Sequence, residues 1–288
     1  MGTFAITGTA SGMGAASAER LRAAGHEVIG VDLREAEVTA DLGTAEGRRY
    51  AVEQVLSLCG GTLDGVAAVA GVGPSLPDAG AVVAINYYGT VQVLEGLRPA
   101  LEHSGTGRAV AITSNSATTV PLIDEALVDL LLDGDGDRGG DEAAARKHAV
   151  QAAREAERVL PSEQLAIAPS VSAYASSKFA LARWVRGTAV TAPWARTGTL
   201  LNAIAPGAVL TPLMIGSTAA DGTEEELDPG SFPTPMPLGT FGRPEDIAFW
   251  VEQFLRPEAR FTTGSVLCVD GGTEAAMRPD AQPTPLRA

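Results

Sequence analysis

Residues 3–32 contain a strand–turn–helix–strand pattern that constrains the fold more than any other part of the sequence. An apolar run at residues 3–6 predicts a short buried strand, and residues 15–24 have the composition of a helix. A second apolar strand follows at residues 27–31. Strands that alternate with helices in this way usually pair in parallel, so we expect an α/β fold.

The turn between the first strand and the helix is rich in glycine. Glycine lets the backbone approach a pyrophosphate closely, and a helix N-terminus supplies free N–H groups and a positive dipole end. The turn therefore predicts a dinucleotide site formed by Gly8, Ser11, Gly12, Met13 and Gly14. Asp32 follows the second strand, twenty residues after Gly12, where a carboxylate can accept hydrogen bonds from an adenosine ribose. The alternative is a plain tight turn followed by a surface aspartate.

Asp32 also predicts which dinucleotide binds. Its negative charge would repel the 2′-phosphate of NADP. Arg34 lies two residues further along the chain and could offset that charge, but Asp32 occupies the closer position. We therefore predict NAD (NADH) as the cofactor.

The alternation of strands and helices continues along the chain. Further strands are expected at residues 63–70, 108–113, 199–204 and 264–269, and helices at residues 44–58, 82–101, 171–190 and from 244 onward. The length of 288 residues allows a substantial core. We predict one domain over residues 1–288, a doubly wound parallel sheet (Rossmann fold) with helices on both faces.

Two segments interrupt this rhythm. Residues 120–170 predict a helical insertion, with helices at 124–132 and 141–159 joined by a flexible acidic turn at residues 133–137. That turn resembles a calcium loop, but its twelfth position holds Ala144 instead of a glutamate, so we predict no metal site. The second helix has the mixed charges of a surface helix. Residues 211–240 predict a lid whose apolar side chains either close a pocket or anchor the loop: Leu213, Met214, Ile215, Phe232, Met236 and Leu238.

Composition excludes several classes of partner. The net charge of −14 argues against nucleic acid and anionic membranes, because phosphate binding needs clusters of Lys and Arg. No apolar run is long enough to span a membrane, and no secretion signal is evident. Cys59 and Cys268 lack metal-ligand spacing and are expected to be reduced core thiols. We therefore expect a cytoplasmic protein.

Four polar residues are candidates for chemistry. Ser114 follows the strand at 108–113, where ligands bind in open α/β sheets, although serine is also a common turn former. Asn86 lies in an apolar helical turn, as either a capped or solvated residue or a backbone or water contact near the site. Tyr174 and Lys178 are four residues apart, so they share one helix face. A nearby cation lowers a phenol pKa from about 10, although a solvated lysine beside a half-buried ring is the common alternative.

Taken together, these motifs resemble the short-chain dehydrogenase/reductase family over nearly the whole chain. The resemblance rests on the order of the glycine-rich turn, Asn86, Ser114, Tyr174-x-x-x-Lys178, Asn202-Ala-Ile-Ala-Pro206-Gly207 and Asp270-Gly271-Gly272. Residues 24–32, 44–47 and 277–279 and the insertion are similar to the bacterial 3α-hydroxysteroid dehydrogenase/carbonyl reductase branch.

The resemblance implies a role for each matching position. Tyr174 would be the general acid/base, Lys178 would lower its pKa and hold the nicotinamide ribose, Ser114 would bind the substrate oxygen, and Asn86 would hold a water in the proton relay. Thr211 would contact the nicotinamide carboxamide or the phosphates. The other implied cofactor contacts are Asp41 and Leu42 beside the adenine, together with Ala70, Gly71, Tyr174, Pro206, Gly207 and Val209.

The chain departs from the family pattern at two places. Residues 68–71 read Ala-Val-Ala-Gly where many members have Asn-Asn-Ala-Gly, and Tyr174 lies 60 residues after Ser114, a much longer separation than is usual. The resemblance implies a homo-oligomer, either a dimer or a tetramer. The insertion would lie beside the active site and near helices that often form dimers, and this argues against the usual tetramer.

The expected activity is hydride transfer between nicotinamide and a secondary alcohol or ketone. A bulky apolar substrate such as a hydroxysteroid is the first hypothesis. The second keeps this chemistry but acts on an aryl alcohol, terpenoid or quinone. The third is a dinucleotide-binding regulator without catalysis.

Overall fold

The computed structural model describes residues 1–133, 141–161, 168–218, 224 and 227–281. Most of the acidic turn expected at residues 133–137 and the last residues of the tail lie outside these ranges. Within these ranges, seven strands form one parallel sheet in the order β3-β2-β1-β4-β5-β6-β7. The predicted doubly wound sheet is confirmed. The strand order reverses between β1 and β4, and ligands bind at such a point in folds of this kind.

The strands are short, and most of them are buried because the sheet is covered on both faces. They are β1 (Thr3–Thr7), β2 (Glu27–Asp32), β3 (Val38–Thr39), β4 (Gly65–Ala68), β5 (Arg108–Ile112), β6 (Leu200–Pro206) and β7 (Val266–Val269). Cys268 lies on the edge strand β7 and is exposed, so its expected place in the core is wrong. The cause is that β7 has a neighbour on one side only.

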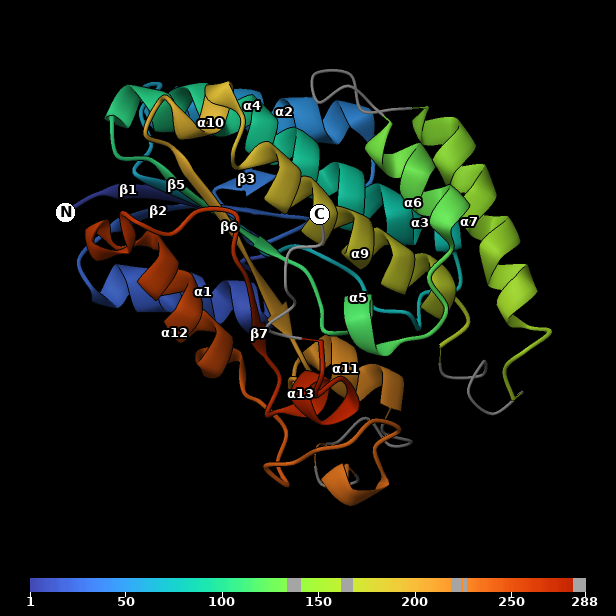
Figure 1. Ribbon diagram of the computed structural model, residues 1–288. Coiled ribbons are helices and arrows are strands. Elements are labelled where there is room, and N and C mark those ends of the chain that lie inside the picture. The colour runs from blue at the N-terminus through green and yellow to red at the C-terminus, as the bar shows by residue number, and fades with distance from the viewer. Residues whose placement is uncertain (134–140, 162–167, 219–223, 225–226, 282–288) are drawn as a thin grey trace, which may run out of the picture.

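Helices cover both faces of the sheet (Figure 1). One face carries α1 (Gly12–Ala23) and α12 (Pro244–Leu255), which pack on each other. The other carries α2 (Ala45–Leu58), α4 (Gly89–Ser104) and α9 (Val171–Thr188). The remaining helices are α3 (Ala79–Val83), the π-helix η1 (Ala84–Tyr88), α5 (Ser116–Thr119), α6 (Glu125–Leu132), α7 (Glu142–Ala156), α10 (Ala192–Ala195), α11 (Pro212–Thr218), α13 (Thr273–Met277) and the short 3₁₀ turns η3 (Pro229–Ser231) and η4 (Pro257–Ala259).

The inserted helices α6 and α7 pack on each other and on α9, at the edge of the domain (Figure 1). Each begins at an aspartate that accepts a hydrogen bond from the first helical turn, Asp124 from Leu127 N and Asp141 from Ala144 N. The surface character expected of α7 is wrong on one side. Its stripe of small residues is buried against α3, α6 and α9, and consists of Ala145, Ala149, Ala152 and Ala156.

The helix expected at residues 82–101 is interrupted. It begins earlier, at Ala79, and passes through the π-helical turn η1 before continuing as α4. A π turn inserts one extra residue into the helix and is frequent at functional sites. Here it contains Asn86. Among the helices of the described ranges, none is long and apolar enough to cross a membrane.

Candidate active site

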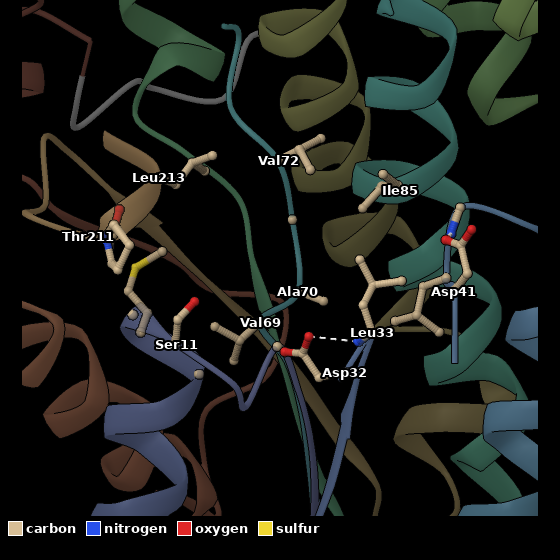
Figure 2. A pocket seen from close by; sticks show the side chains of 18 of the residues that line it. Ser11, Asp32, Leu33, Asp41, Val69, Ala70, Val72, Ile85, Thr211 and Leu213 are labelled. Carbon is tan, nitrogen blue, oxygen red and sulfur yellow. Dashed lines mark hydrogen bonds between the residues drawn. The ribbon is translucent and has the colours of Figure 1, made fainter. Parts of the chain in front are cut away.

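A cavity of about 220 Å³ lies at the carboxyl ends of β1, β2 and β4, where the strand order reverses. Figure 2 shows Ser11 and Thr211 on one side of it and Asp41 and Ile85 on the other, with Asp32 between them. The cavity brings together most of the residues predicted to bind the cofactor. They are Gly8, Ser11, Gly12, Met13, Gly14, Asp32, Asp41, Leu42, Ala70, Gly71 and Thr211.

The glycine-rich turn has a geometry that side chains would prevent. Gly8 and Gly12 have φ values of 80° and 55°, in the left-handed region. A Cβ on Gly14 would lie 2.0 Å from the carbonyl oxygen of Gly8. The turn therefore lies directly against the first turn of α1, and its free N–H groups form a cradle that fits a pyrophosphate.

Both carboxylate oxygens of Asp32 are bound to the main chain. Oδ2 accepts a hydrogen bond from Ala10 N at 3.0 Å and Oδ1 accepts one from Leu33 N at 2.6 Å (Figure 2). On the opposite side, the Thr7 hydroxyl accepts hydrogen bonds from Val69 N at 3.0 Å and Ala70 N at 2.9 Å. These bonds fix the ends of β1, β2 and β4 relative to one another around the cavity.

A second cavity of about 310 Å³ adjoins the first. The two share the lining residues Met13, Val69, Gly71, Val72, Thr211 and Leu213. The second cavity contains the remaining predicted residues except Asn86, namely Ser114, Tyr174, Lys178, Pro206, Gly207 and Val209. Its other walls are largely apolar. A cofactor in the first cavity would therefore extend toward these polar side chains.

Tyr174 and Lys178 both reach the second cavity from α9, as their spacing predicts. Lys178 is 4% exposed, and its Nζ donates a hydrogen bond to the carbonyl oxygen of Ile112 at 2.9 Å. Nζ lies 6.0 Å from the centre of the Tyr174 ring. Three serines hold the helix in place: Ser170 Oγ donates to Leu76 O, Ser172 Oγ donates to Leu122 O, and Ser176 Oγ accepts from Asp124 N.

The electrostatic environment differs from the simple cation–phenol pair that the spacing suggests. Burial raises the pKa of Tyr174, and a hydrogen bond with the Ser114 side chain only partly offsets this. Burial also lowers the pKa of Lys178 to about 8. Burial dominates both shifts, because it disfavours the phenolate of Tyr174 and the ammonium of Lys178.

Ser114 is held firmly at the end of β5. The residues on either side are tied to β6, because Thr113 N donates to Ile204 O at 2.8 Å and Asn115 N donates to Pro206 O at 2.9 Å. The Ser114 hydroxyl also accepts a hydrogen bond from Ser116 N at 3.2 Å. Its side chain is 8% exposed and lines the second cavity.

Asn86 lies beneath the cavities and is fully buried. Its Nδ2 donates to Val72 O at 3.0 Å, and its Oδ1 accepts from Val72 N at 2.9 Å. A Cβ on Gly71 would lie 3.0 Å from Asn86 Oδ1 and 3.5 Å from Lys178 Nζ. Of the two alternatives for Asn86, the structure shows the backbone contact, and it fixes the segment that passes between Asn86 and Lys178.

The expected lid contributes only part of its apolar residues to the second cavity. Leu213, Met214 and Phe232 line it, whereas Ile215, Met236 and Leu238 do not, and Leu238 is 73% exposed. Sequence reasoning missed other lining residues, because their positions depend on how loops cross the strand ends: Leu33, Gly43, Val72 and Ile85 in the first cavity, and Pro74, Thr119, Val120 and Thr234 in the second.

The buried lysine predicts a stability that depends on pH. Its folded pKa of about 8 lies below the value of about 10.4 in an unfolded chain. Between these two pKa values, Lys178 binds fewer protons in the folded protein than in the unfolded chain. The free energy of unfolding therefore rises with pH. We expect the free energy of unfolding to rise by about 2 kcal/mol more between about pH 7.5 and 9.5 in the native protein than in Lys178→Met. Urea unfolding measures this, and the exposed Lys147→Met is the control. The same rise of the free energy of unfolding with pH in Lys178→Met and in the native protein would contradict this prediction.

Similarity to known proteins agrees with this geometry. A family model described as short chain dehydrogenase matches residues 3–125, and one described as Enoyl-(Acyl carrier protein) reductase matches residues 147–274. The 3-alpha-hydroxysteroid dehydrogenase/carbonyl reductase of Comamonas testosteroni is 36% identical over 279 residues, which is 97% of this chain and 99% of that protein.

This chain belongs to the short-chain dehydrogenase/reductase family. Among solved structures, the 3-alpha-hydroxysteroid dehydrogenase from Pseudomonas sp. B-0831, complexed with NADH, matches with a TM-score of 0.81 and 38% identity, covering 97% of this chain and 99% of that one. Levodione reductase matches with a TM-score of 0.67 and 24% identity over 95% of this chain and 98% of that one, a likeness of fold alone.

As a short-chain dehydrogenase/reductase, the protein is an oxidoreductase that acts on CH–OH and carbonyl groups and binds a nicotinamide dinucleotide. The bound nicotinamide accepts or supplies the hydride. The described residues contain no group of three or more His, Cys, Asp or Glu side chains that could hold a metal ion.

Proposed function

We propose that this short-chain dehydrogenase/reductase transfers a hydride between NAD(H) and a bulky apolar secondary alcohol or ketone such as a hydroxysteroid. The observation that carries the proposal is the second cavity. It places Ser114, Tyr174 and Lys178 in one largely apolar space of about 310 Å³ that opens onto the nucleotide cavity. The relatives from Comamonas testosteroni and Pseudomonas sp. B-0831 are named as 3α-hydroxysteroid dehydrogenases, which supports a steroid substrate.

Each polar residue in the cavity has a separate task in this proposal. Tyr174 donates a proton to the substrate oxygen during ketone reduction and removes it during alcohol oxidation. Its raised pKa keeps the proton in place at neutral pH, which suits reduction. Ser114 binds the same substrate oxygen, and its hydrogen bond with Tyr174 aligns the two hydroxyls. Lys178 holds the nicotinamide ribose and favours the phenolate when the proton leaves.

Apolar residues of the lid and of β-strand ends shape the remainder of the second cavity. Leu213 and Met214 come from α11 and Phe232 from the segment that follows η3. These side chains exclude water from the reacting carbonyl and favour a large apolar substrate by burial of its surface. Thr211, between the two cavities, contacts the cofactor in this proposal.

A substrate panel tests the proposed activity. We expect NADH absorbance to fall with 3-ketosteroids and to rise when NAD is mixed with 3-hydroxysteroids, with a kcat/KM at least tenfold above that for aryl alcohols, terpenoids and quinones of similar polarity. Faster turnover of aryl alcohols, terpenoids or quinones would show that this other class, and not hydroxysteroids, is the preferred substrate. Tight NADH binding with no turnover of any carbonyl would favour the non-catalytic regulator.

The proposed preference for NAD depends on Asp32. Its carboxylate is fixed at the end of β2 by two main-chain hydrogen bonds and points into the nucleotide cavity (Figure 2). We expect kcat/KM to favour NADH over NADPH by roughly 10²-fold, because a fixed carboxylate repels a 2′-phosphate. Asp32→Ser should reduce this ratio about tenfold or more. Glu27→Gln, at the opposite end of β2, is the control. An NADPH preference in the native protein would reject the proposal.

The proposal also includes a cytoplasmic homo-oligomer. Large aromatic side chains are exposed in one part of the chain: Phe249 and Trp250 on α12 are 41% and 37% exposed, and Phe261, after η4, is 97% exposed. Exposed apolar groups of this size are typical of association surfaces. Light scattering of the purified protein measures the mass directly, and a monomer at all concentrations would reject this part.

A further inference from the structure

Arg48 is a charged side chain buried almost completely, at 1% exposure. It lies on α2, and its guanidinium donates hydrogen bonds to four separate acceptors. Nη1 donates to Leu42 O at 3.0 Å and to Ala84 O at 3.4 Å, and Nε donates to Gln92 Oε1 at 2.8 Å. Nη2 pairs with the carboxylate of Glu142. One side chain therefore joins α2, the loop before it, η1, α4 and the inserted helix α7.

Two of these acceptors belong to segments that line the nucleotide cavity. Leu42 itself forms part of the wall, and Ile85, the residue after Ala84, forms another part. The wall is packed closely against α2. A Cβ on Gly47, in the first turn of α2, would lie 2.0 Å from the carbonyl oxygen of Asp41. The guanidinium thus fixes both sides of the corner where the adenine is expected to bind.

Among the described residues, the carboxylate paired with the guanidinium comes from the insertion. Glu142 is the first residue of α7, and its Oε2 lies 2.5 Å from Arg48 Nη2. Burial lowers the pKa of Arg48, and the charge of Glu142 counteracts this. An arginine buried without its carboxylate is strongly unfavourable, so the side chain would turn toward water and release its carbonyl partners.

We propose that Arg48 and Glu142 form a positioning pair through which the inserted helix α7 fixes the Leu42–Ile85 corner of the nucleotide cavity and sets the affinity for the adenosine half of the cofactor. This inference rests on the proposed cofactor. The insertion then has a role in cofactor binding in addition to its contact with α9. Neither residue touches the reacting atoms, so their effect is on binding and not on the chemical step.

Binding measurements on three variants test the pair. We expect Glu142→Gln and Arg48→Lys each to weaken ADP-ribose and NADH by roughly tenfold in calorimetric titrations, the loss expected when one charged hydrogen bond no longer holds the wall. The double variant Arg48→Met/Glu142→Leu replaces the buried pair by apolar groups, which often restores stability. It should melt near the native temperature yet bind ADP-ribose as weakly as the single variants. kcat at saturating NADH should not change.

Glu155→Gln, on the exposed side of the same helix α7, is the matched control and should bind ADP-ribose as the native protein does. A double variant that is stable and binds ADP-ribose with native affinity would overturn the proposal. The proposal would also be overturned if kcat fell by as large a factor as the affinity for ADP-ribose. The pair would then act on the nicotinamide half of the cofactor, where the reaction takes place. A failure of the proposed function would give a different result. The native protein would then bind ADP-ribose but reduce no ketone, and the Arg48 and Glu142 variants would still bind ADP-ribose more weakly than the native protein.

Discussion

Replacing Tyr174 by phenylalanine is expected to lower kcat by about 10²–10⁴-fold or more, the usual contribution of a positioned general acid. The change removes one hydroxyl from a ring that is held within α9, so packing is preserved. The variant should still bind NADH, because the cavity expected to hold the adenosine half and the pyrophosphate does not contain Tyr174. Stopped-flow reduction of the preferred ketone measures the first quantity, and fluorescence titration measures the second.

Tyr50 provides the matched control for this variant. It lies on α2, is 47% exposed and lines neither cavity, so Tyr50→Phe should retain full activity. A Tyr174→Phe variant that keeps more than about a tenth of native kcat would show that another group, or water, donates the proton. The hydrogen bond with Ser114 would then serve only to orient the substrate.

Replacing Gly14 by alanine is expected to weaken NADH binding by roughly 10²-fold or more. The new Cβ would lie 2.0 Å from Gly8 O, a distance that no relaxed structure allows, so the glycine-rich turn must separate from α1. Overpacking of this kind destabilises a fold by about 1–3 kcal/mol. The displaced N–H groups no longer match a pyrophosphate, and we expect the NADH dissociation constant to rise by roughly 10²-fold or more. Titration of NADH and urea unfolding measure the two effects.

Gly187 is the matched control, because it lies in the last turn of α9 with open space where a Cβ would be. Gly187→Ala should leave NADH binding unchanged and raise stability by about 0.5 kcal/mol through helix propensity. Native affinity in Gly14→Ala would show that the turn can move without loss, and would remove the argument that it forms the phosphate cradle.

The parts of the fold that the sequence predicted well are those set by residues close together in the sequence. Thr44, where a helix was expected to begin, caps α2 by accepting a hydrogen bond from Gly47 N. Pro244 begins α12 because its missing N–H is tolerated at a first turn. Strand β3, only two residues long, was not predicted, since its pairing with β2 gives no periodic signal of its own. The π turn at Asn86 escaped prediction for the same reason.

In the candidate site, too, features set by residues close in sequence were predicted and features set by tertiary contacts were not. The glycine spacing, Asp32 and the pair Tyr174 and Lys178 are local patterns, and the structure places them around two adjoining cavities. The pKa values of the pair could not be read from spacing, because burial by β5 and neighbouring loops changes both. Half of the apolar lid residues do not line the cavity, and periodicity in an irregular segment cannot show which of them do.

The sequence by itself determined the parallel α/β fold, the glycine turn against a helix and the face of α9 that carries Tyr174 and Lys178, because these follow from backbone geometry over a few residues. Only the tertiary structure decided the direction in which the pKa values of that pair shift, the contact of Asn86 with Val72 and the place of Arg48 between the insertion and Leu42. These depend on which distant groups exclude water from a side chain, and chain order does not encode this in any short pattern.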